Sequence, residues 1–167
     1  MEKFELVATT LFGLEDLLIS ELEEIGAEDI RRAHRAVSFK GDLEVLYKSN
    51  LYLRTAIKVL KPIAEFEAYN DKKLYAKIKQ IDWSAYLNND KTFAIDGTVS
   101  GEIFTHSQYA ALTCKDAIVD QFRENTGARP SIDTEDPDLR INIRITHRSC
   151  ILSIDSSNKP LSKRGYK

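Results

Sequence analysis

The order of strand-like and helix-like segments near the start of the chain restricts its possible folds most strongly. Alternating apolar and polar residues predict a strand over residues 3–9. Leucines spaced three and four residues apart then predict a helix that ends near Gly26. Two short strands are expected over residues 29–34 and 36–40.

A second helix and a further strand complete this pattern. Asp42 is the expected N-cap of a helix that presents Leu43, Leu46 and Tyr47 on one face. Residues 53–66 are rich in Ile, Val and Leu and predict the last strand. The resulting order, strand–helix–strand–strand–helix–strand, is the split βαβ or ferredoxin-like pattern, which predicts an α+β unit.

The second half of the chain predicts another unit of mixed helices and strands. Asn70 is the expected N-cap of a helix, and a strand is expected over residues 91–99. The longest helix is predicted over residues 105–125, with apolar side chains four residues apart. Alternating patterns over residues 139–146 and 149–154 predict a β-hairpin.

Composition is that of a water-soluble protein, with 43% hydrophobic and 30% charged residues. No apolar run approaches the roughly 20 residues that cross a bilayer, and the acidic N-terminus does not match a signal peptide. We therefore expect a cytoplasmic protein without a membrane partner. Cys114 and Cys150 share no CxxC spacing, so buried, reduced packing cysteines are expected rather than a metal site.

The net charge of -2 hides a basic segment near the end of the chain. Residues 140–167 hold seven basic residues and one acidic residue, Asp155. A phosphate backbone is the common partner of such a segment. The alternative is a solvated surface whose charge is balanced by the acidic residues within 133–138.

Eight cations are candidate nucleic-acid contacts: Lys115, Arg123, Arg129, Arg140, Arg144, Arg148, Lys163 and Arg164. Solvated surface or packing is the alternative for the first six, and the lining of a hinge to a further domain is the alternative for the last two. Arg140 and Arg144 are four residues apart on one predicted strand, so they project from the same face. Arg129 precedes Pro130, which stiffens its loop. We expect these side chains to converge on a single surface that faces phosphate groups.

Sequence signatures of catalysis are missing. The seven glycines are isolated, so neither a Walker A motif nor a GxGxxG fingerprint can be formed. There is also no GxSxG nucleophile elbow. We therefore expect this chain alone to be non-catalytic and to bind a partner. The alternative to nucleic-acid binding is a ferredoxin-like module that binds proteins or a small regulatory ligand.

Several segments resemble a known family in the same order. The matching segments are FGLEDLLISELEEIGA near the start, IDWSAYL, CKDAIVDQFR (114–123), Gly127 with Arg129-Pro130, the segment 136–139, and KRGY (163–166). Together they are similar to the THUMP-containing region of the large-subunit ribosomal RNA guanine-N2 methyltransferases.

The resemblance implies a ferredoxin-like domain over residues 1–66, a THUMP domain over 67–161 and a linker over 162–167. In the family, a methyltransferase domain that uses S-adenosylmethionine follows, and its Asn/Asp-Pro-Pro-Tyr motif does not occur here. No cofactor is therefore expected in this chain. The implied partners are structured RNA, ribosomal RNA rather than tRNA, and the C-terminal methyltransferase domain.

Overall fold

The computed structural model describes residues 2–33 and 35–156, and these form two compact α+β units. The first unit runs to Pro62 and also includes Asp155 and Ser156, and the second spans Ile63–Ile154. The expected boundary after Phe66 therefore lies within a strand that both units share. The predicted linker, residues 162–167, lies outside the described residues.

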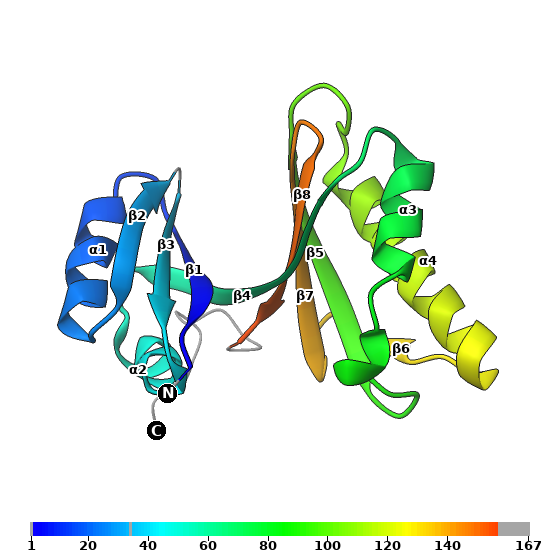
Figure 1. Cartoon of the computed structure of the whole chain (residues 1–167), viewed down its shortest axis with the longest axis horizontal. Coiled ribbons are helices and arrows are strands. Elements are labelled where there is room, and N and C mark those ends of the chain that lie inside the picture. The colour runs from blue at the N-terminus through cyan, green and yellow to red at the C-terminus, as the bar shows by residue number, and fades with distance from the viewer. Residues whose placement is uncertain (1, 34, 157–167) are drawn as a thin grey trace. The chain divides into compact units, whose positions relative to one another are not determined.

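The first unit has the expected ferredoxin-like order of strands and helices (Figure 1). Its elements are β1 (Phe4–Thr10), α1 (Glu15–Glu24), β2 (Glu28–Ala33), β3 (Ala36–Gly41), α2 (Leu43–Tyr52) and β4 (Ala56–Glu67). The strands lie in the order β2-β3-β1-β4, and each neighbouring pair is antiparallel. Leu18 and Leu22 of α1 and Val45 of α2 join the same buried cluster, so both helices cover one face of this sheet. The prediction of a ferredoxin-like α+β unit is confirmed.

The second helix begins as predicted but buries a different face. Asp42 accepts a hydrogen bond from the backbone N–H of Val45 at 3.0 Å, which confirms the N-cap. Leu43 and Tyr47 are 64% and 66% exposed, whereas Val45 and Ser49 are buried. The predicted apolar face was therefore wrong for Leu43 and Tyr47, whereas Leu46 is partly buried against the core cluster as expected. The helix is turned so that Val45 packs against Gly41, where a side chain would collide with it.

The second unit has two helices, a short 3-10 helix and a sheet. After β4 come α3 (Asp71–Lys79), the 3-10 helix η1 (Trp83–Ala85), β5 (Thr92–Ser100), α4 (Ser107–Thr126), β6 (Ser131–Ile132), β7 (Leu139–Thr146) and β8 (Ser149–Asp155). The strand order is β4-β8-β7-β5-β6. Strand β5 is parallel to β6 and β7, and β7 forms an antiparallel hairpin with β8. The strand β6 was not predicted, because two residues carry no periodic pattern.

The core of the second unit lies between its helices and one face of its sheet (Figure 1). Cys114 and Ile118 of α4 cluster with Ile141, Ile143 and Ile145 of β7. Asn70 caps α3 through a bond from Lys73 N at 2.8 Å, and Gly127 ends α4 in the left-handed region. The predicted N-cap of α3 is confirmed.

Both cysteines are buried and free, as expected from their spacing. None of the helices within the described ranges is long and apolar enough to span a membrane.

Candidate nucleic-acid interface

One face of the second unit's sheet, the face opposite α3 and α4, carries polar side chains. On β7, Arg140, Asn142 and Arg144 alternate with the three buried isoleucines. Thr98 of β5 lies beside Arg144 in the strand register, and Ile151 of β8 lies on its other side. We call Arg140, Asn142, Arg144 and Thr98 the polar face. It holds the two strand arginines that the sequence analysis selected.

Arg140 is engaged within the fold. Its Nη1 donates to Asp96 Oδ2 at 3.2 Å, and its Nη2 donates to the carbonyl oxygen of Thr134 at 3.3 Å. The side chain is only 14% exposed. Because a carboxylate already compensates the guanidinium, Arg140 contributes less to an external phosphate site than its position suggested.

Two other predicted cations also have acidic partners. Arg148 Nε lies 3.8 Å from Glu67 Oε2, and its guanidinium is 5.5 Å from the ring centroid of Tyr69. Lys115 Nζ lies 3.6 Å from Asp116 Oδ1. Both pairs are exposed enough for water to screen them, so they weaken but do not abolish the charge offered to a ligand.

Three other predicted cations, Arg123, Arg129 and Arg144, have no carboxylate partner among residues 2–33 and 35–156. Arg144 is partly exposed on β7, and Arg123 is exposed in the last turn of α4. Arg129 follows α4, and its Nε donates to the Pro130 carbonyl oxygen at 3.2 Å. Lys163 and Arg164 lie outside the described residues.

The predicted cations that lie within the described residues do not meet on a single surface, which corrects the expectation of convergence for them. Helix α4 packs on the isoleucine face of β7, so Lys115 and Arg123 belong to the opposite side of the sheet from Arg144. The reason is the two-residue period of the strand, which separates the core-facing residues from the arginines between them. Which of these cations contact RNA stays a prediction.

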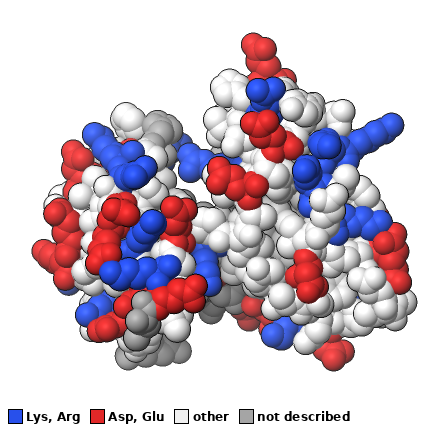
Figure 2. Space-filling model, viewed as in Figure 1, with Lys and Arg blue, Asp and Glu red and all other residues white. Residues whose placement is uncertain are grey.

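Helix α3 holds a group of lysines that the sequence analysis missed. Lys72 and Lys73 are exposed, and Lys77 is partly exposed one turn after Lys73. None of the three has an acidic partner in the described part of the chain. We call these residues the α3 surface, and Figure 2 shows Lys and Arg gathered over this helix. The signal was present in the segment DKKLYAKIK, which was interpreted only for its apolar positions.

Nearby acidic groups of α4 are occupied by contacts with α3. The Tyr75 hydroxyl donates to Asp120 Oδ2 at 2.5 Å, and this hydrogen bond raises the pKa of Tyr75. Lys79 Nζ donates to Glu124 Oε1 at 2.6 Å, which raises the pKa of Lys79. These contacts hold the two helices together, and Lys79 neutralises Glu124, whereas Asp120 keeps its charge and accepts from a neutral hydroxyl. Neither carboxylate forms an ion pair with a lysine of the α3 surface in the described part of the chain.

The described residues include no group of acidic, His or Cys side chains that could hold a metal ion. The arrangement offers cations and hydrogen-bond donors, which suit binding of a polyanion through its phosphates. A ferredoxin-like unit is thus followed by a mixed α/β unit with exposed cations. This arrangement is suited to a nucleic-acid-binding region.

Comparison with protein-family models identifies the family. The RlmL ferredoxin-like domain matches residues 5–60, and the THUMP domain matches residues 68–155. The chain belongs to the THUMP-domain family, in the arrangement where an RlmL ferredoxin-like domain precedes the THUMP domain.

Two curated relatives are each 41% identical over 160 residues, or 96% of this chain. One is the ribosomal RNA large subunit methyltransferase K/L of Syntrophotalea carbinolica, of which the match covers 22%. The other is slr0064 of Synechocystis sp., whose name contains the words RNA methyltransferase, and the match covers 42% of it. The chain thus spans less than half of each relative.

Solved structures have the same fold over almost the whole chain. SMU.472, solved in complex with SAH, is 28% identical with a TM-score of 0.81, and the match covers 99% of this chain and 45% of that one. A structure from Listeria monocytogenes described as a predicted N6-adenine-specific DNA methylase is 29% identical with a TM-score of 0.81. The match covers 99% of this chain and 43% of that structure.

Proposed function

We propose that this chain is the RNA-binding, substrate-positioning region of a methyltransferase that uses S-adenosylmethionine. The THUMP match and the identity to the K/L methyltransferase support this role. The observation that carries it is the set of cations without acidic partners on the second unit, namely the α3 surface with Arg123, Arg129 and Arg144. These groups bind phosphate without first breaking an internal ion pair.

The α3 surface is the stronger part of this proposed interface. Lys73 and Lys77 lie one turn apart on a rigid helix, so they reach successive phosphates of one strand without rearrangement. Arg144 supplies a planar guanidinium on the polar face, where it contacts a second segment of the same folded RNA. Contacts of this kind recognise shape and backbone rather than sequence.

Salt-dependent binding of the full chain to a structured RNA hairpin tests the proposal. Lys73→Gln and Arg144→Gln should each weaken binding and lower the slope of log K against log salt by about one. Lys91→Gln is the matched control, because Lys91 is an exposed lysine between η1 and β5. Fluorescence anisotropy at several salt concentrations measures both quantities. Binding that is equal in all three variants would contradict the proposed interface.

The proposal also includes the target RNA and the methylated position. We propose ribosomal RNA as the target, rather than tRNA, and guanine-N2 as the methylated position, in line with the resemblance to that family. S-adenosylmethionine would be bound outside residues 1–167, because the isolated glycines of this chain form no cofactor loop. The chain would be non-catalytic and would hold the RNA for a C-terminal methyltransferase domain. Methylation assays of the full-length protein on ribosomal RNA and tRNA, with mapping of the product, test these points.

One observation favours a second candidate function, a protein-interaction or small-ligand module. An apolar hollow of about 370 Å³ lies between α4 and the β5–β6 edge. Leu112 and Ile132 line it and are 53% and 38% exposed. This function would show peptide or ligand binding that is insensitive to salt, together with no affinity for RNA.

A further inference from the structure

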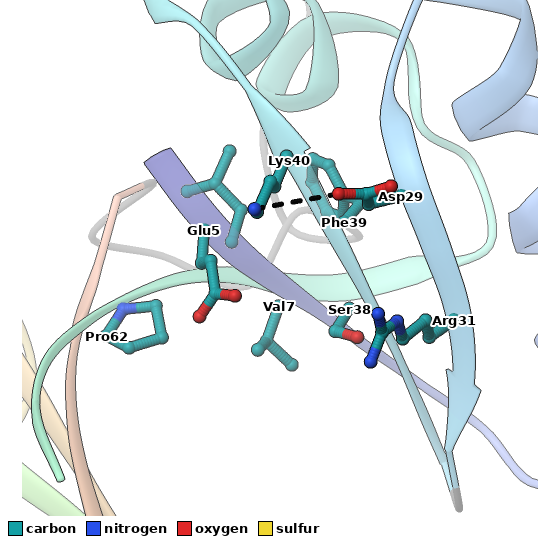
Figure 3. A pocket seen from close by; sticks show the side chains of 9 residues that line it. Glu5, Val7, Asp29, Arg31, Ser38, Phe39, Lys40 and Pro62 are labelled. Carbon is teal, nitrogen blue, oxygen red and sulfur yellow. Dashed lines mark ion pairs between the residues drawn. The ribbon is translucent and has the colours of Figure 1, made fainter. Parts of the chain in front are cut away.

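The first unit has a hollow on the sheet face opposite α1 and α2 (Figure 3). Leu6 and Phe39 point into the core with the helices, and their strand neighbours point the other way. The outward-pointing residues that matter for the argument are Glu5, Val7, Arg31, Ser38 and Pro62. All belong to the first unit.

The strand register sets these side chains in two neighbouring rows. Arg31 of β2 lies opposite Ser38 of β3, and Ser38 lies opposite Val7 of β1. Neighbouring strands are about 4.8 Å apart, so these three residues form a row about 10 Å long. Glu5 begins the next row, opposite Lys40. In Figure 3, Glu5 and Arg31 lie on either side of Val7 and Ser38.

Two of the four charged side chains that line the hollow are paired with each other. Lys40 Nζ lies 3.6 Å from Asp29 Oδ2, so that pair is compensated. Arg31 and Glu5 have no ion-pair or hydrogen-bond partner among the described residues, and both are exposed. The hollow therefore presents one guanidinium and one carboxylate, separated by a hydroxyl and an aliphatic side chain.

This combination is selective for a particular ligand chemistry. A guanidinium with a hydroxyl binds a phosphate, whereas a carboxylate repels one. The carboxylate requires a ligand with N–H donors, and two adjacent donors give it a bidentate contact. Among the four bases, guanine presents adjacent N1–H and N2–H donors, and cytosine and adenine present one amino group. Val7 and Pro62 supply aliphatic surface for the flat side of a base or ribose.

We propose that this hollow binds one unpaired guanosine nucleotide of an RNA strand. Glu5 accepts hydrogen bonds from the Watson–Crick edge of the base, and Arg31 with Ser38 binds the phosphate. At about 170 Å³ the hollow is smaller than the ~300–1,000 Å³ of typical small-molecule sites, which suits one group of a longer polymer rather than a free ligand. The assignment rests on the proposed function, and it adds base selection to a region that otherwise recognises the RNA backbone.

The test compares short single-stranded RNAs that differ in one base. The full chain is titrated with fluorescently labelled UUGUU, UUCUU, UUAUU and UUUUU, and anisotropy gives each Kd. We expect the guanine oligonucleotide to bind about fivefold more tightly than the uridine one, the low end for a bidentate base contact because the site is exposed. Glu5→Gln should remove this preference, since an amide offers one acceptor oxygen. Arg31→Gln should weaken binding of all four about threefold to tenfold.

A control variant distinguishes binding in the hollow from general effects of charge. Glu23→Gln removes an exposed carboxylate of α1 outside the hollow and should keep the guanine preference. Equal affinity for all four oligonucleotides in the wild type would overturn the proposal, and so would a guanine preference that survives Glu5→Gln. If the wild type lacks the preference but still binds a structured hairpin through Lys73 and Arg144, only this proposal fails. Loss of both kinds of binding would also refute the proposed function.

Discussion

Glu15 is a buried carboxylate that joins two loops of the first unit. It is 2% exposed, its Oε1 accepts from Gly13 N at 2.8 Å, and its Oε2 accepts from Arg35 N at 3.1 Å. Backbone N–H groups, first its own and then that of Arg35, lower the pKa of Glu15 by stabilising the charged form. The unfolded chain therefore takes up this proton at a higher pH than the folded chain. The stabilising contribution is complete above the ordinary value of 4.5 and is lost as the pH falls through the lowered pKa.

Replacing Glu15 by Gln tests this linkage. The amide accepts through one oxygen only, so one of the two loop N–H groups loses its partner and the urea midpoint at pH 7 should fall. The difference from wild type should narrow as the pH drops from 7 toward 3, because the wild type then loses its charged acceptor as well. Urea titrations at pH 7, 5, 4 and 3 measure this. Glu23→Gln should differ little from wild type, and a gap that stays constant across this range would contradict the linkage.

The two cysteines should be unreactive while the protein is folded. Burial raises the pKa of Cys150 to about 11, and it raises that of the fully buried Cys114 further. At pH 8 only about one Cys150 in a thousand is a thiolate, which is the reactive form. A thiol reagent such as DTNB should label neither cysteine in the native state and both in 6 M guanidinium. Rapid native labelling would show that the second unit opens around α4.

At the scale of elements, Gln121 of α4 holds the segment that connects α3 to η1. Its side-chain oxygen accepts from Trp83 N at 3.1 Å, and its nitrogen donates to the carbonyl oxygens of Lys79, at 2.7 Å, and Ile81. We expect Gln121→Leu to lower the free energy of unfolding by about 1–3 kcal/mol, because it leaves these backbone groups without partners. Gln108→Leu, at an exposed position of the same helix, is the control. Urea denaturation measures the free energy of unfolding of both variants. Equal stability of the two would contradict this role of Gln121.

The sequence predicted elements well where a periodic pattern is long. In α4, apolar residues four apart continue for several turns, and all of Ala110, Cys114, Ile118 and Phe122 are buried. In α2 the pattern is short and mixed, so Leu43 and Tyr47 were expected to pack although the fold buries Val45. That choice depends on tertiary packing, because Val45 joins residues distant in the sequence in the buried cluster of the first unit.

The candidate site was less predictable than the fold, because charge compensation depends on contacts between strands. Arg140 and Arg144 look equivalent in the sequence, but Asp96 of β5 pairs with Arg140, whereas Arg144 has no ion pair in the described part of the chain. The lysines of α3 were visible in the sequence, but which of them are compensated depends on Glu124, 45 residues from Lys79. Sequence alone gives the number of cations and not their partners.

At the scale of the whole molecule, a net charge of -2 limits how RNA can be bound. Long-range attraction to a polyanion is absent, so affinity must come from a few uncompensated cations at short range. On the second unit these are divided between the two sides of the sheet, and a single RNA strand on the α3 surface contacts about three phosphates through Lys72, Lys73 and Lys77. Non-specific Kd values of about 10⁻⁴ to 10⁻⁶ M are expected for such contacts at physiological salt.

The salt dependence of the wild-type chain should therefore be moderate. With about three contacts on the α3 surface and one from Arg144, log K should fall with a slope near -3.6, and affinity should drop about 150-fold between 50 and 200 mM salt. A surface on which all the predicted cations met would make six or more contacts and lose about 10³-fold or more over the same range. Anisotropy titrations of a structured hairpin across this range distinguish the two cases. The steeper dependence would mean that the RNA also reaches cations beyond the α3 surface and Arg144, such as Arg123 and Arg129.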